Sequence, residues 1–372
     1  METNRIPIVF ICDENYALPT AVAMTSLKLS KHKTTQYDVF VIGMGVGEDS
    51  KNRILSLNDE GFSVSILEKR MREKQAKIAQ VRARVTHAAL LKFDLPDLFP
   101  ELDKLLYLDS DMLIQKDLTE LYQTDLGEAY AGVVNDAITV WDKEHLEFLQ
   151  FKERLYFNSG MLLLNLKKMR EDSLPEKLLD YRLNGKNFYM DQDTLNVVFA
   201  GNIRLVSPEY NLLNCFFTWH GIEEMETFYE TEFPRCEEFI YQNAAILHFG
   251  DEKKPWRHYM GYLSTLYTAV YNRSPYADKP LVLDGDPLVE SEAVRAEQER
   301  RIAEQEQRIA ELDRQIAGHI KFIEETQRSA SFRIGRFFTW IPRKLRGGVR
   351  CLRENGFSYT LHRAFAHLTR RA

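Results

Sequence analysis

The most constraining feature of the sequence is the stretch KLLYLDSDML at 104–113, where a short apolar run ends in two carboxylates. Residues 105–108 have the length and composition of a buried strand. Asp109 and Asp111 follow directly, and the apolar run resumes at Met112. Because burying an unpaired carboxylate is costly, these acids must either reach solvent at a turn or have a positive partner.

Strand-like and helix-like segments alternate along the first two thirds of the chain. The segment IPIVFIC at 6–12 is apolar and β-branched, which is typical of a strand buried on both faces of a parallel sheet. The pattern predicts further strands at 37–45, 62–68, 105–108, 130–134, 161–165 and 245–249, and helices at 20–30 and 49–59. Such alternation indicates an α/β fold with a mostly parallel, Rossmann-like sheet flanked by helices. Ligands bind beyond the carboxyl ends of strands in such sheets, where Asp13, Asp109 and His248 stand.

The composition changes after about residue 275. A Pro- and Gly-containing stretch resembles a linker, and isoleucines then recur every seven residues from Ile302 to Ile323. This heptad segment predicts either a short coiled coil, which suggests a homodimer without fixing the oligomer order, or a helix lying on the main domain. The expected domains are 1–275 (main domain), 276–290 (linker), 291–328 (coiled-coil helix) and 329–372 (basic amphipathic tail).

The charge distribution narrows the classes of partner. The net charge of -6 gives no indication of nucleic acid as the main partner. The tail is basic and rich in Phe, Trp and Ile, which suits either an interfacial helix on anionic lipid or a solvated helix packed on the acidic main domain. The N-terminus has no signal-peptide pattern, no run is long enough to span a bilayer, and the four cysteines are scattered. We therefore expect a cytoplasmic protein, peripheral on the inner face of the cytoplasmic membrane if the tail binds lipid.

The two acids at the end of the apolar run can both face one cation. Hard divalent ions such as Mn²⁺ and Mg²⁺ take oxygen ligands and often bridge a carboxylate to substrate phosphates. The alternative is a solvated turn in which the aspartates cap backbone N–H groups. Asp117 and Glu120 already supply a predicted capping box for the next helix, so Asp109 and Asp111 are not needed for that role.

Three further stretches carry polar groups next to apolar runs. ILHFGDEKKPW at 246–256 offers an imidazole, His248, and an ammonium, Lys254, that suit a metal and a phosphate respectively. YFNSGMLLLNL at 156–166 sets an Asn-Ser-Gly turn before a strand, and YMDQDTLN at 189–196 opens an amphipathic helix. Taken singly, each also fits a plain turn or, for Asp191 or Asp193, a helix N-cap.

Together, in this order and spacing, these motifs resemble glycosyltransferase family 8 over about residues 6–262. This retaining, metal-dependent family includes bacterial lipopolysaccharide galactosyl- and glucosyltransferases and glycogenin, and the resemblance implies a GT-A nucleotide-sugar-binding fold. The stretches that carry it are FICDENY, LDKLLYLDSDMLIQKDLTELY, YFNSGMLLLNLKKMRE, DQDTLN and H…KPW.

The resemblance also implies roles for individual residues. Asp109, Asp111 and His248 match the metal ligands, with Mn²⁺ or Mg²⁺ as the ion. The uridine and ribose pocket matches Ile11, Asp13, Asn15 and Tyr16, and Lys254 matches the lysine on the diphosphate. Asn158, Asp191 and Gln192 match the catalytic groups around the donor sugar, and Asp136 an acid near sugar and acceptor. Lys92 stands where family members often carry Arg, and Asp251 departs from the family's His-turn pattern.

The implied activity is metal-dependent, retaining transfer of glucose or galactose from a UDP-sugar to a glycan or glycolipid acceptor, in lipopolysaccharide or other cell-surface polysaccharide synthesis. Retention requires either a covalent intermediate, for which Asp191 is a better nucleophile than Gln192, or same-face attack, which we favour. Two other functions remain open. A catalytically degenerate adapter would act through the coil and tail, and a nucleotidyltransferase would need a Gly-rich loop where this chain has DENYALP. The Gly-rich stretch VIGMGVGED at 41–49 does not fit a dinucleotide-binding fingerprint and is interpreted as a turn.

Overall fold

A computed structural model of the chain describes residues 5–70, 73, 75, 78, 90–138, 142–151, 155–284, 302–305 and 307–311. The chain divides into two compact units, 1–286 and 287–372. In the second unit, 302–305 and 307–311 are helical, and Ile302 and Ile309 are exposed. The remainder of the predicted coiled coil, the basic tail and the end of the linker lie outside the described residues.

The first unit is built on a seven-stranded sheet with the strand order β3-β2-β1-β4-β7-β6-β8. Only β7 among these runs antiparallel to its neighbours, so the sheet is mostly parallel, as the sequence predicts. The strands are β1 (Arg5–Asp13), β2 (Gln36–Met44), β3 (Phe62–Glu68), β4 (Lys104–Leu108), β6 (Ala131–Val133), β7 (Met161–Asn165) and β8 (Ile203–Leu205).

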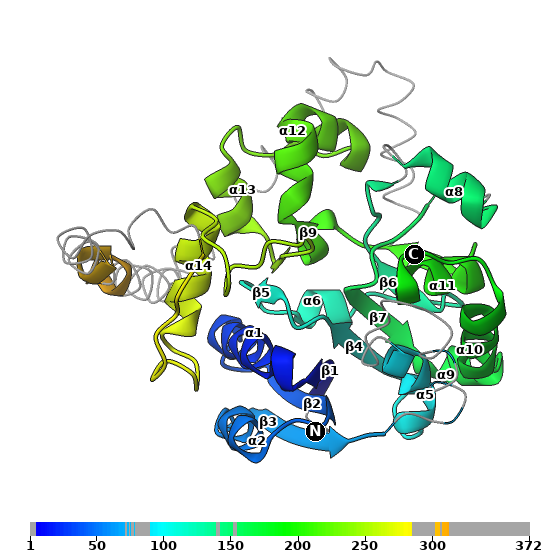
Figure 1. The fold of residues 1–372 in the computed structure, drawn as a ribbon, viewed down its shortest axis with the longest axis horizontal. Coiled ribbons are helices and arrows are strands. Elements are labelled where there is room, and N and C mark those ends of the chain that lie inside the picture. The colour runs from blue at the N-terminus through cyan, green and yellow to red at the C-terminus, as the bar shows by residue number, and fades with distance from the viewer. Residues whose placement is uncertain are drawn as a thin grey trace, which may run out of the picture. The chain divides into compact units, whose positions relative to one another are not determined.

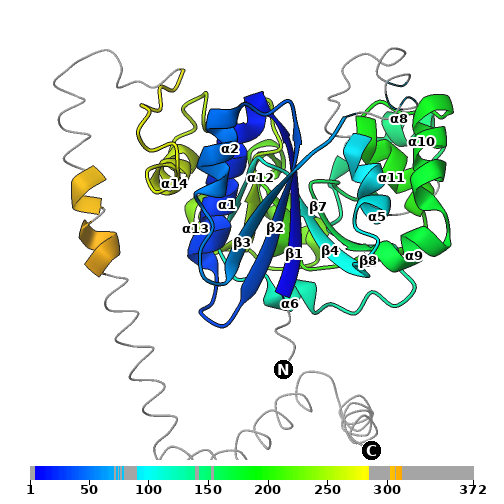
Figure 2. The ribbon, with the colours of Figure 1, turned by 90° about the horizontal axis from the view of Figure 1, so that it is seen from below.

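Helices cover both faces of this sheet, as Figures 1 and 2 show. Side chains of β1 alternate between two apolar clusters, so Ile8 and Phe10 pack toward one helical layer and Val9 and Ile11 toward the other. One layer contains α1 (Ala17–Ser30) and α2 (Glu48–Leu55). The other contains α5 (Leu95–Leu98), α9 (Leu166–Glu171), α10 (Leu174–Asn184) and α11 (Met190–Phe199), with the short η2 (Lys92–Asp94).

A second, three-stranded sheet stands beside the first, with the order β5-β10-β9. Its strands are β5 (Met112–Ile114), β9 (Leu212–Leu213) and β10 (Ile246–His248). The remaining elements are η1 (Glu14–Tyr16), α6 (Thr119–Tyr122), α8 (Lys143–Leu149), η3 (Pro208–Asn211), α12 (Asn214–Tyr229), α13 (Glu237–Asn243) and α14 (Tyr262–Tyr271). Within the described part of the chain, none of the helices combines the length and apolar character needed to cross a bilayer.

Three local expectations differ from the structure. The helix expected at 49–59 ends at Leu55, because the Asn58 side chain bonds both the N–H and the carbonyl of Val64 and turns the chain toward β3. The strand expected at 245–249 is β10, which belongs to the small sheet and pairs antiparallel with β5. Asp117 does not form a capping box: α6 begins after Leu118, and the Asp117 carboxylate accepts from the N–H groups of Thr119 and His32.

Candidate active site

The turn that carries Asp109 and Asp111 links the two sheets. It leaves the main sheet at the end of β4 and enters the small sheet at β5. Antiparallel pairing of β4 with β7 sets Leu108 opposite Met161, so the Asp109 N–H donates to the Gly160 carbonyl at 2.8 Å. The first carboxylate is therefore fixed by the register of the main sheet.

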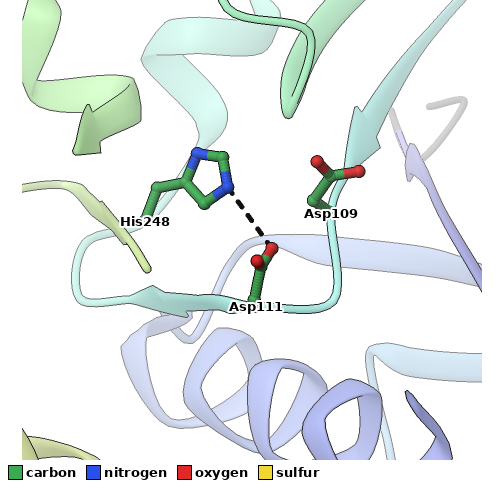
Figure 3. A group of neighbouring side chains, drawn as sticks. All are labelled: Asp109, Asp111 and His248. Carbon is green, nitrogen blue, oxygen red and sulfur yellow. Dashed lines mark ion pairs between the residues drawn. The ribbon is translucent and has the colours of Figure 1, made fainter. Parts of the chain in front are cut away.

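His248 is placed by the register of the small sheet. β10 pairs antiparallel with β5 so that His248 lies opposite Met112, and the Phe249 N–H donates to the Asp111 carbonyl at 2.9 Å. The imidazole Nε2 lies 3.3 Å from the Asp111 carboxylate (Figure 3). One ligand atom from each of Asp109, Asp111 and His248 lies within 4.8 Å of the others.

These three residues fit a divalent cation of the Mn²⁺ or Mg²⁺ type. Two carboxylates and one imidazole would provide oxygen donors and one nitrogen donor, and a cation held by three protein ligands could still accept oxygen ligands from a substrate. The space beside them depends on Gly160, where a Cβ would stand 2.4 Å from His248 Cε1 and 3.0 Å from the Asp109 carboxylate. A side chain at this position would displace the imidazole, so the close approach requires glycine.

Lys92 is the positive partner of the first carboxylate. Its ammonium lies 3.1 Å from Asp109 and 2.7 Å from Asp191, and the side chain is only 5% exposed. It also lies over the Tyr107 ring, 4.7 Å from the centroid. Burial alone would lower the pKa of Lys92, but the two carboxylates outweigh burial and raise this pKa above its ordinary value. Lys92 is therefore an internal counter-ion between two acids.

Asp111 has different positive partners. The Lys254 ammonium donates to its carboxylate at 2.8 Å, and the His248 imidazole lies on the other oxygen. Burial alone would raise the pKa of Asp111, but His248 and Lys254 reverse the effect and hold it below its ordinary value. For Asp109, burial dominates and raises the pKa, against the opposing effect of Lys92. The second acid of the pair is thus the one most firmly held as a carboxylate.

Two cavities meet at the acidic turn. The first, of about 210 Å³, opens beyond β1 and is lined by Ile11, Cys12, Asp13, Tyr16, Lys92, Tyr107, Asp109, Ser110, Asp111 and Met190. The second, of about 370 Å³, lies toward His248 and contains the expected sugar-side groups Asp136, Asn158 and Gln192. Asp109, Asp111 and Met190 line both cavities. The acidic turn therefore stands between a compartment at the end of β1 and a compartment beside β7.

The polar groups of the second compartment form one connected network. The Asp136 carboxylate accepts from the Asn158 amide at 3.2 Å and the Gln192 amide at 3.1 Å. The Gln192 carbonyl oxygen accepts from the Ser159 N–H. Burial raises the pKa of Asp136, although these hydrogen bonds oppose it. The Gln192 amide is thereby held in one orientation, with its NH₂ toward Asp136.

At the start of α11, neither Asp191 nor Asp193 acts as a simple N-cap. Asp191 is turned to Lys92 and accepts from the Ser159 hydroxyl at 3.0 Å. Asp193 is fully buried and accepts from the backbone N–H groups of Phe188 and Tyr189, with Tyr156 and His145 on its other oxygen. This clamp holds a turn in which Met190 has φ of 45°, a strained value for a side chain of this size.

Most of the residues singled out in the sequence converge on this region, two do so through a neighbouring side chain, and Asn15 does not. Asp191 and Lys254 line neither cavity but contact Lys92 and Asp111 respectively. Asn15 is exposed on η1 and lines neither cavity. The departure at Asp251 is a turn residue whose carboxylate accepts from the Glu252 N–H.

Sequence reasoning missed three residues of the site. Tyr107 donates its hydroxyl to Asp109, and Ser159 joins Asp191 to Lys92. Both lie inside stretches that the motifs cover, Tyr107 two positions before Asp109 and Ser159 next to Asn158, so their closeness in sequence to residues already named was the available signal. Asn211 bonds His248 from η3, 37 residues earlier in the chain, and no local pattern points to it.

Comparison with known proteins agrees with this architecture. The family model for glycosyl transferase family 8 matches residues 7–259, which is more than half of the chain. The chain belongs to glycosyltransferase family 8. Lipopolysaccharide 1,2-glucosyltransferase of Escherichia coli is 28% identical over 278 residues, covering 72% of this chain and 78% of that protein. General stress protein A of Bacillus subtilis is 24% identical over 280 residues, covering 68% of this chain and 93% of that protein.

The solved structures show the same fold. Galactosyltransferase LgtC, crystallised with donor and acceptor sugar analogues, superposes with a TM-score of 0.61 at 24% identity, covering 72% of this chain and 96% of LgtC. The expected GT-A type of fold is therefore confirmed. Membership of family 8 makes the function that of a glycosyltransferase, and Asp109, Asp111 and His248 form a candidate metal site within it.

Proposed function

We propose that this family 8 member is a metal-dependent, retaining hexosyltransferase. It would move glucose or galactose from a UDP-sugar to a glycan or glycolipid acceptor during the synthesis of lipopolysaccharide or another cell-surface polysaccharide. The observation that carries the proposal is the meeting of two cavities at Asp109 and Asp111, the two acids that form a candidate metal site with His248. The similarity to the lipopolysaccharide 1,2-glucosyltransferase of Escherichia coli supports a hexose and a lipopolysaccharide-type acceptor.

The residues divide between the two halves of the donor. In the first cavity, Ile11, Asp13 and Tyr16 would bind the uridine and ribose, together with Asn15, which is exposed on η1. Asp109, Asp111 and His248 would hold Mn²⁺ or Mg²⁺. When bound, such an ion neutralises charge that develops on a leaving diphosphate. The Lys254 ammonium donates a hydrogen bond to Asp111 and would add a second positive charge beside the diphosphate.

The second cavity suits the hexose and the acceptor. Asp136, Asn158 and Gln192 present amide and carboxylate groups that can hydrogen-bond sugar hydroxyls. Asp191, the candidate nucleophile, is 6% exposed and engaged by Lys92 and the Ser159 hydroxyl. A carboxylate held in this way is a poor nucleophile, which supports same-face attack with the diphosphate oxygen helping to deprotonate the acceptor. Mass spectrometry that trapped a hexose on Asp191 would overturn this mechanism.

The proposal predicts metal-dependent release of UDP. Incubated with Mn²⁺, the wild-type chain should hydrolyse UDP-glucose or UDP-galactose slowly, and EDTA should abolish the release. Hydrolysis with one donor and not the other would also identify the sugar. Release that persists in EDTA would contradict the metal-dependent reaction, and release from neither donor under Mn²⁺ would favour the degenerate adapter.

The second unit carries two further proposals. We infer that the heptad segment, 291–328, forms a homodimeric coiled coil and that the basic tail, 329–372, contacts anionic membrane surfaces. The exposure of Ile302 and Ile309 on the described helix supports the first. Deleting 329–372 should move the protein from the membrane fraction to the soluble fraction. Deleting 291–372 should reduce the molar mass measured by light scattering from that of a dimer to that of a monomer. An unchanged distribution or mass would contradict the corresponding proposal.

A further inference from the structure

The side of His248 that faces away from Asp111 is engaged by another side chain. Its Nδ1 lies 2.8 Å from the Asn211 Oδ1, and both residues are buried. Asn211 closes η3, just before β9, and β9 pairs parallel with β10 so that Leu213 lies opposite His248. The same small sheet that places His248 beside Asp111 therefore places Asn211 behind it.

The orientation of the Asn211 amide is determined by its neighbours. The Gly160 backbone N–H, which can only donate, bonds the Asn158 Oδ1 at 3.0 Å. The Asn158 oxygen also lies 2.9 Å from the Asn211 Nδ2, so that nitrogen must be the donor. The Asn158 NH₂ on the other side donates to Asp136. The Asn211 oxygen is thus left facing His248.

An amide oxygen can only accept, so the His248 Nδ1 must carry a proton. The lone pair available for a ligand bond is then on Nε2, the nitrogen that faces Asp111. We propose that Asn211 is a positioning residue that fixes the tautomer and ring angle of His248, and thereby makes Nε2 the metal-binding atom. The outer hydrogen bond of a metal-binding histidine commonly has this effect, and its loss typically weakens metal binding 10–100-fold.

This inference rests on the proposed function, since it assumes that His248 binds the metal. The hydrogen-bond network of the second cavity would therefore also determine the orientation of His248. Asn158 bonds Gly160 and Asp136 on one side and Asn211 on the other, and Asn211 bonds His248. These hydrogen bonds connect Asp136, expected near the hexose, to His248, expected at the metal. Asn158 would then act on both compartments.

The test is the affinity of the full chain for Mn²⁺, measured by electron paramagnetic resonance of the free ion, with and without UDP. Asn211→Leu keeps the approximate volume and removes both hydrogen bonds, and we expect Mn²⁺ binding to weaken about 10–100-fold. Asn211→Asp keeps an acceptor for the Nδ1 proton and should stay within a few-fold of wild type. The loss in Asn211→Leu should be accompanied by loss of the imidazole ¹⁴N signal in electron spin-echo spectra at saturating Mn²⁺.

Asn165→Leu is the matched control. Asn165 lies at the far end of β7 and also makes several hydrogen bonds, to the Gly127 and Ala129 carbonyls and the Lys168 N–H. It should leave Mn²⁺ affinity unchanged even if it lowers stability. Equal Mn²⁺ affinity and an intact ¹⁴N signal in Asn211→Leu would overturn the inference and leave the proposed function standing. A wild-type chain that binds no Mn²⁺, with or without UDP, would overturn both.

Discussion

Replacing Asp111 by asparagine is expected to reduce metal-dependent UDP release by at least about 10²–10³-fold, the loss typical when one fixed electrostatic contact to a developing charge is removed. The amide has the shape of the carboxylate but carries no charge. It removes one of the two negative charges that a cation would meet, and it breaks the ion pair with Lys254. Because Asp111 has the lowered pKa of the two acids, it provides the more permanent of these charges.

The measurement is UDP release from UDP-glucose and UDP-galactose at several Mn²⁺ concentrations, with Mn²⁺ affinity determined in parallel. Asp103→Asn is the matched control, because Asp103 precedes the other end of β4 and its side chain is 77% exposed. That variant should behave as wild type in both assays. If Asp111→Asn retained Mn²⁺ affinity and turnover, the cation would not bind at the acidic turn, and the proposed donor site would be wrong.

The strands of the main sheet could be predicted from local composition. The segment at 6–12 is apolar without interruption, and the structure buries all of it within β1. The acidic turn could be recognised from the sequence just as well, because a carboxylate directly after a buried strand is energetically costly unless it has a partner. In both cases the decisive information lies within about ten consecutive residues.

The partners of those acids could not be predicted in this way. Lys92 and Asp191 are separated by 99 positions and meet only because η2 and α11 cover the same sheet face. The assignment of 245–249 to the small sheet had the same difficulty, since a strand of three residues, Ile246–His248, could pair equally well with any exposed strand edge. Asn211 could not be predicted for a related reason: the role of this amide at the end of η3 becomes apparent only when the β9–β10 register is known.

Replacing Lys92 by methionine is expected to lower the free energy of unfolding by about 3–5 kcal/mol, the usual cost of removing one partner from a buried ion pair. Methionine fills much of the lysine volume, so the loss arises mainly from leaving Asp109 and Asp191 without their common cation. The pKa of Lys92 is raised in the folded chain, so its stabilising contribution is fully present below about pH 10 and is lost only at higher pH.

The measurement is urea unfolding at neutral pH in EDTA and again with Mn²⁺. Lys92→Arg keeps the charge and should lose much less stability, while Lys104→Met is the matched control. The Lys104 ammonium also lies over a tyrosine ring, at 5.0 Å, but donates to the Thr124 carbonyl instead of bridging two acids.

Mn²⁺ should stabilise Lys92→Met more than wild type, because a cation on Asp109 replaces part of the missing charge and ligand binding to the folded state raises its stability. A Lys92→Met variant as stable as wild type in EDTA would mean that water reaches Asp109 and Asp191 and that Lys92 is free to contact the donor. If Lys92→Met is destabilised and Mn²⁺ recovers part of the loss, then Lys92 and the cation act on the same carboxylate. The negative charge that Lys92 neutralises would then be the same charge that binds the metal.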